Sequence, residues 1–131
     1  MRHWFNNQAS GYDWISRTTR IAIYMRDKYT CLACGASPSD DVRLSLDHLE
    51  PNGGNRPSNL VTLCLSCNSA RRDTPAAEWS RGFAARAQKA VVKPLDRSAA
   101  LAVAKARWPG RYERARVRAQ QRKAAQRRSL A

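Results

Sequence analysis

Two short stretches decide the fold: CLACG at residues 31–35 and CLSC at residues 64–67. They contain all four cysteines of the 131-residue chain, in two pairs whose members are separated by two residues. This spacing lets a tight turn direct both thiolates of a pair at one ion, and two such turns supply the tetrahedral ligand set that structural Zn²⁺ prefers. We therefore predict a closed zinc site that stabilises the fold and does no chemistry, formed by Cys31, Cys34, Cys64 and Cys67.

Two other interpretations of the cysteines stay open, a redox-active pair and two disulfides. A redox pair would account for one C-x2-C sequence but not for two. The longest apolar runs, IAIYM and LVTLCL, are too short for a signal peptide or a membrane span. We therefore expect a protein of the reducing cytoplasm, or of the host cytoplasm if a virus encodes it, where structural disulfides are rare.

The charge of the chain indicates a polyanionic partner. Twenty-four Lys and Arg residues stand against ten Asp and Glu residues, which gives a net charge of +14 and a pI of about 10.8. Nucleic acid is the leading partner, because each neutralised phosphate releases counterions. A membrane surface suits the chain less well, since no strongly apolar helix face accompanies the charge.

The central segment alternates between helix and strand patterns. The sequence VRLSLDH places Val42, Leu44 and Leu46 on one side of a strand, and the loop LEPNGGNRPS follows it. We expect the last helix of the segment to begin at Ser66 as N-cap. The predicted order is helix, strand, loop, strand and helix, at residues 16–28, 42–48, 49–58, 59–63 and 66–73, which is an α+β fold.

The composition changes to Ala and Arg after Pro75. We predict a helix interrupted at Gly82 and a second helix capped by Asp96 and closed by Pro109. Residues 111–128 carry seven Arg and one Lys against one Glu, which is half of the net charge. The chain is thus divided into an N-terminal extension at 1–16, a central domain at 17–74, and a basic helical extension at 75–131.

The central segment resembles the HNH endonucleases. The resemblance covers residues 17–74, and it rests on the order and spacing of RDKYTCLACG, LDHLEP, GGNRPSNLVTLCLSCN and SARR. It implies the small ββα-metal fold in its four-cysteine, zinc-bearing branch. The activity that it implies is hydrolysis of DNA phosphodiester bonds with one catalytic divalent ion.

The resemblance also implies roles for single residues. His48 matches the general base that activates water, and Asp47 matches a ligand of the catalytic ion. Asn59 matches the residue that braces the loop and supports the base. Asn68 stands where many members have a final His, so the pattern is H-N-N, and its amide oxygen would favour Mg²⁺ or Mn²⁺. The residues alone agree in one respect: His is the natural base near neutral pH, and the other histidine, His3, lies outside the cysteine frame.

The expected partner is double-stranded DNA, with a homodimer or another protein partner left open. Asn68, Arg71 and Arg72 are spaced to share one helix face, and Arg71 stands where family members often carry a phosphate-binding Lys. We predict DNA contacts from Arg56, Arg71, Arg72, Arg114, Arg118 and Arg122.

One difficulty and one rival function accompany this interpretation. On a regular strand Asp47 and His48 point to opposite faces, so they serve one site only if the strand ends or twists there. The rival is a non-catalytic zinc module that binds DNA or RNA through its basic tail. The sequence favours the enzyme, because a binding module needs none of Asp47, His48 and Asn68. Whether such an enzyme nicks or cuts both strands is left open.

Overall fold

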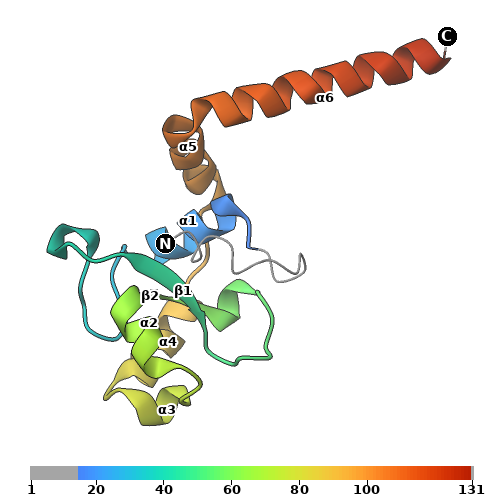
Figure 1. Cartoon of the computed structure of the whole chain (residues 1–131). Helices are drawn as coiled ribbons and strands as arrows, with labels where there is room; N and C mark the ends of the chain where they lie inside the picture. Colours follow the sequence, from blue (N-terminus) through green and yellow to red (C-terminus); the bar gives the residue numbers. More distant parts are fainter. Residues whose placement is uncertain (1–14, 131) are drawn as a thin grey trace.

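The structure, a computed structural model, describes residues 15–130. All but the last two residues of the predicted N-terminal extension lie outside this range. A two-stranded antiparallel sheet pairs β1 (Leu44–His48) with β2 (Leu60–Cys64), and helix α2 (Leu65–Arg71) follows β2 directly. This ββα unit, with the four cysteines gathered beside it, confirms the predicted α+β fold (Figure 1).

The sheet separates two apolar clusters, because side chains alternate between the faces of a strand. Leu44, Leu46 and Leu60 lie in one cluster with Ile23 and Tyr24. The last two belong to helix α1 (Arg17–Arg26), which begins at Ser16, whose side chain accepts from the Thr19 N–H at 3.1 Å.

On the other face, Val61 and Leu63 of β2 pack with Cys31, Cys64 and Phe83. All five residues of β2 are buried, since both of its faces are covered. Cys31 and Cys64 therefore belong to the packed interior, while Cys67 is partly buried and Cys34 is exposed.

A buried ion pair fixes α1 to the sheet. The Arg26 guanidinium pairs with Asp27 at 2.8 Å and donates to the carbonyl oxygens of Leu60 and Pro57. Asp27 in turn accepts from the Thr62 N–H at 3.0 Å. These bonds connect the end of α1 to β2 and to the 3-10 turn η3 (Pro57–Asn59), which carries Asn59.

The C-terminal helices extend the same core beyond residue 74. Helix α3 (Ala76–Trp79) is separated from α4 (Phe83–Val91) by Gly82, whose φ of 79° lies in the left-handed region, so the predicted interruption is observed. Phe83 at the start of α4 is fully buried against the second cluster.

Helix α5 (Arg97–Arg107) packs on α1, and its N-cap is the predicted Asp96, which accepts from the Ala99 N–H at 2.9 Å. The body of the protein therefore continues as far as α5.

Helix α6 (Pro109–Leu130) contributes no buried residue, and it extends away from the body in Figure 1. Pro109, expected only to close the preceding helix, is the first residue of α6, a position that tolerates its missing N–H. None of the helices that the structure describes is long and apolar enough to cross a membrane.

The start of α2 differs from the prediction. Its N-cap is Cys64, whose sulfur accepts from the Cys67 N–H, and not Ser66, which lies exposed within the helix. The capping oxygen expected from a hydroxyl is thus replaced by a cysteine sulfur.

We predict that Phe83→Ala lowers the free energy of unfolding by about 3 to 5 kcal/mol, because it removes a fully buried ring. Val92→Ala, at a site 76% exposed directly after α4, should stay within about 0.5 kcal/mol of wild type. Urea unfolding of the two variants measures this. Equal stabilities would mean that α4 is not part of the core.

Candidate functional site

The four cysteine sulfurs lie within 4.8 Å of one another, an arrangement that can hold one metal ion. Within each turn a backbone N–H points at the first sulfur, from Cys34 to Cys31 at 3.5 Å and from Cys67 to Cys64 at 3.4 Å. All four are free thiols, and the Cys34 and Cys64 sulfurs are 3.9 Å apart. This ligand set fits Zn²⁺, which favours four thiolates in a closed site.

Backbone polarity prepares Cys31 for this role. Burial raises the pKa of a thiol, but the N–H groups of Cys34 and Cys64 outweigh burial and lower the pKa of Cys31 to about 7. A thiolate is the form that binds metal, so a thiol that ionises near neutral pH is a better ligand.

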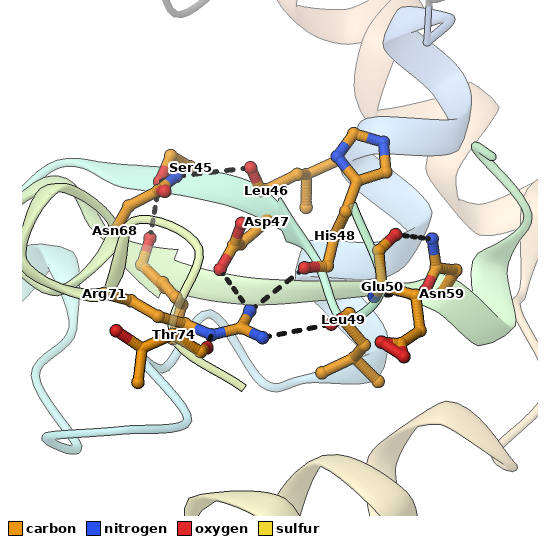
Figure 2. A network of polar contacts seen from close by, with 11 residues as sticks. Ser45, Leu46, Asp47, His48, Leu49, Glu50, Asn59, Asn68, Arg71 and Thr74 are labelled. Carbon is orange, nitrogen blue, oxygen red and sulfur yellow. Dashed lines mark hydrogen bonds and ion pairs between the residues drawn. The ribbon is translucent and has the colours of Figure 1, made fainter. Parts of the chain in front are cut away.

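The end of β1 is held by an ion pair with α2. Nη1 of Arg71 lies 2.6 Å from Oδ2 of Asp47, and the exposed fractions of the two side chains are 2% and 16% (Figure 2). Burial raises the pKa of the Asp47 carboxyl, and the charge of Arg71 opposes that shift. Burial is the larger effect, so the pKa of Asp47 lies above its ordinary value, and the ion pair with Arg71 limits that rise.

The guanidinium of Arg71 also donates hydrogen bonds to the backbone. It donates to the carbonyl oxygens of His48 and Leu49, both at 3.0 Å, and of Thr74 at 2.9 Å. Its guanidinium also lies 5.4 Å from the centroid of the Phe83 ring. The expectation that Arg71 faces phosphate therefore does not match the structure, which buries this side chain inside the domain.

The other two arginines predicted near the site are exposed. Arg56 lies on the loop after β1, and Arg72 follows α2 with a φ of 51°. Arg72 therefore does not continue the helix face of Asn68 as predicted. Both side chains remain accessible to a ligand.

The amide of Asn68 has a fixed orientation. The Ser45 hydroxyl donates to the Leu63 carbonyl at 3.0 Å, so its oxygen is left to accept the Asn68 amide N–H at 2.8 Å. A second N–H of the same amide reaches the Leu46 carbonyl at 3.3 Å. With its nitrogen committed to β1, Asn68 offers its carbonyl oxygen Oδ1 to a metal ion.

A hydrogen bond to the loop after β1 holds the imidazole of His48. Its Nε2 atom lies 2.6 Å from Oδ1 of Asn55. An amide oxygen only accepts, so in the neutral ring Nε2 carries the proton and Nδ1 has the free lone pair. Asn55 thereby sets which nitrogen of His48 is available as a base.

Asn59, which is buried, ties the loop together. Its Oδ1 accepts from the Glu50 N–H at 2.9 Å, and its Nδ2 donates to the carbonyl oxygens of Glu50 and Gly54. A Cβ atom at Gly53 would lie 2.7 Å from Nδ2 of Asn59, so a larger residue there would displace the brace. The loop that carries Asn55 is thus built around Asn59.

Asp47 of β1 and Asn68 of α2 each make a hydrogen bond between these two elements, Asp47 with Arg71 and Asn68 with Ser45, while the ring of His48 points away from Asp47 (Figure 2). His48 is the last residue of β1, but His48 and Asp47 both lie in the paired part of the strand, opposite Leu60 and Val61. The alternation of side chains therefore still holds here, and the end of the strand does not bring the two side chains to one side.

Sequence reasoning missed Ser45 and Asn55, the two residues that orient Asn68 and His48. The alternating pattern marked Ser45 only as a polar strand residue, and Asn55 lies in a Gly-rich loop that looked like a simple turn.

Comparison with known proteins identifies the unit. Residues 31–74 match the model of the HNH endonuclease family. The chain is also similar to the CRISPR-associated endonuclease Cas9 of Actinomyces naeslundii, 38% identical over 55 residues, or 39% of this chain and 5% of that protein. The Cas9 of Corynebacterium diphtheriae is 33% identical over 66 residues, or 47% of this chain and 6% of its own length. No solved structure is significantly similar to the chain.

Residues 31–74 therefore match the HNH endonuclease family, and this match confirms the resemblance seen in the sequence. The chain spans only about a twentieth of the length of the curated relatives it matches.

We predict that the purified protein contains about one zinc ion per chain and that Cys64→Ser abolishes both the zinc and the fold. In a small domain, zinc binding supplies part of the free energy of folding. Losing one of the four ligands should therefore unfold the domain and not merely lower its activity. Elemental analysis and circular dichroism measure the two effects. Ser66→Ala, two residues further on and exposed, is the control and should keep both. A folded, metal-free Cys64→Ser protein would contradict the zinc assignment.

We also predict that Arg71→Ala destabilises the protein by about 3 to 5 kcal/mol, because it leaves the Asp47 carboxylate half-buried and without its partner. Arg71→Lys keeps the charge but not the fork of donors, so its effect should be intermediate. The neighbouring Arg72→Ala removes the same side chain from an exposed position and should be near neutral. Chemical unfolding distinguishes these cases. Equal losses of stability in Arg71→Ala and Arg72→Ala would contradict the stabilising role of the Arg71–Asp47 ion pair.

Proposed function

We propose that the protein is a metal-dependent DNA endonuclease or nickase that hydrolyses phosphodiester bonds at the β1–α2 junction. The observation that carries the proposal is the placement of Asp47, His48 and Asn68, at the end of β1 and on α2, within a segment that matches the HNH family. The names of the similar Cas9 endonucleases support the same class of reaction.

The base in this proposal is His48, acting through Nδ1. Asn55 holds the opposite ring nitrogen at 2.6 Å, which suits Nδ1 to take a proton from an attacking water. Asn59 acts indirectly, because it holds the loop on which Asn55 lies.

Asp47 and Asn68 would hold the catalytic ion. A carboxylate and an amide oxygen are hard ligands, so the donor set fits Mg²⁺ or Mn²⁺ better than Zn²⁺. When bound there, the ion supplies charge neutralisation for the scissile phosphate and the leaving oxygen. Asp47 would share its carboxylate between that ion and Arg71.

Contacts to the DNA would come from the exposed arginines. Arg56 and Arg72 flank the site, and Arg114, Arg118 and Arg122 lie on α6. Such contacts to phosphates fix position and add affinity without reading the sequence. We assign no phosphate contact to Arg71, because its guanidinium is buried.

A cleavage assay on supercoiled plasmid with Mg²⁺ tests the base. His48→Ala should lower the rate by about a hundredfold or more, the scale of a lost general base, while DNA affinity and unfolding stay as in wild type. Glu50→Gln, two residues on and exposed, is the matched control and should cleave normally. Near-wild-type cleavage by His48→Ala would remove His48 from the mechanism.

The same assay separates the enzyme from a zinc module that only binds nucleic acid. Mild chelation should stop cleavage while zinc content and circular dichroism are unchanged, and added Mg²⁺ or Mn²⁺ should restore it. Absence of cleavage with every divalent ion tried, by a folded protein that binds DNA, would favour the binding module.

A further inference from the structure

The arginines chosen for DNA contact from the sequence occupy only one side of α6. Arg114, Arg118 and Arg122 are spaced by four residues and form a stripe along the helix, which we call stripe A. Successive residues turn by about 100°, so Arg116, Lys123 and Arg127 lie on roughly the opposite side. These three form stripe B.

Nothing in the described part of the protein covers either stripe. Every member of both stripes is exposed, and no residue of α6 is buried. Between the stripes, on one side, lie the small side chains of Ala115 and Ala119. The helix therefore has two cationic edges, stripe A and stripe B, and on one side they are separated by a narrow face of small side chains.

The charge on α6 disfavours the isolated helix. Like charges four residues apart repel, as between Arg118 and Arg122 or Lys123 and Arg127. The described helix has one intrahelical ion pair, from Arg116 to Glu113. A partner that brings negative charge to both edges would relieve this repulsion.

We propose that α6 lies in the major groove of B-form duplex DNA, with stripe A on the phosphates of one strand and stripe B on those of the other. An α-helix with its side chains is about 10–12 Å across, and the groove is about 12 Å wide. The 22 residues of α6 span about 33 Å, close to one turn of duplex. The inference rests on the proposed function only for the choice of DNA as partner.

The test compares two triple variants of the full chain, each with three cations changed to Gln. One removes Arg114, Arg118 and Arg122, and the other removes Arg116, Lys123 and Arg127. Binding to a B-form duplex is followed by fluorescence polarisation over a range of salt, without added divalent ion. Each triple should reduce the magnitude of the slope of log K against log salt by about 2 to 3, since each phosphate contact contributes about 0.9.

Duplex RNA of the same length is the matched control ligand. Its major groove is too deep and narrow for a helix, so only one edge of α6 can reach a backbone, and the two triples should no longer have equal effects. Circular dichroism confirms that both variants remain helical.

Three outcomes would overturn the proposal. A loss confined to stripe A on DNA would mean that the helix lies along one backbone. Equal losses on DNA and on duplex RNA would mean that only total charge matters. No loss from either triple would mean that α6 serves another partner. Because no cleavage is measured, a failure here leaves the His48 result standing, and a failure of cleavage leaves this result standing.

Discussion

The site depends on one buried guanidinium. Arg71 reaches from α2 to Asp47 and to the carbonyl oxygens of His48 and Leu49, so it holds the strand at the point where β1 ends. The carbonyl oxygens beyond a strand end have lost their ladder partners and need other donors when they are shielded from water. A fork of donors meets that need from one side chain, and a Lys in its place would supply a point charge but not the same geometry. The ion pair with Asp47 thus has two effects: it stabilises the fold, and it limits the rise that burial causes in the pKa of Asp47.

Asn68 and His48 are each held by a hydrogen-bond partner that occupies one polar atom of the side chain and leaves the other available. Ser45 donates to the sheet and therefore has to accept from Asn68, which turns the Asn68 oxygen outwards. Asn55 accepts from His48 at Nε2, which leaves Nδ1. Each constraint follows from a count of donors and acceptors and needs no strained geometry. A site assembled this way is ordered before substrate arrives, which lowers the cost of positioning later.

The cysteine pairs, both strands and the interruption at Gly82 could be predicted from the sequence, because they follow from local spacing and from the conformations that Gly allows. The burial of Arg71 could not. Its partners lie 22 to 24 residues earlier in the chain, apart from the carbonyl of Thr74, and the helix pattern alone presents it as one more surface cation. The N-cap of α2 was misassigned for a similar reason, since the sulfur of Cys64 replaces the expected hydroxyl of Ser66. Nor did composition reveal that α4 belongs to the core: an Ala-rich segment looks like a free helix until Phe83 has a cluster to enter.

The buried guanidinium also bears on how the protein would hold DNA. With Arg71 committed to the interior, Arg56 on the loop after β1 and Arg72 directly after α2 are exposed arginines near the proposed catalytic residues in the sequence. Half of the net charge lies instead on residues 111–128, on a helix that has no buried residue and packs its Tyr112 against the core. In the proposed function, DNA affinity and chemistry therefore lie on different elements. A cation that neutralises phosphate at a distance does not compete with a metal ion for Asp47, whereas a mobile cation in the site would. Separating them lets the β1–α2 junction keep only those charges that its own packing requires, and it leaves the density of charge on α6 free of any constraint from the core.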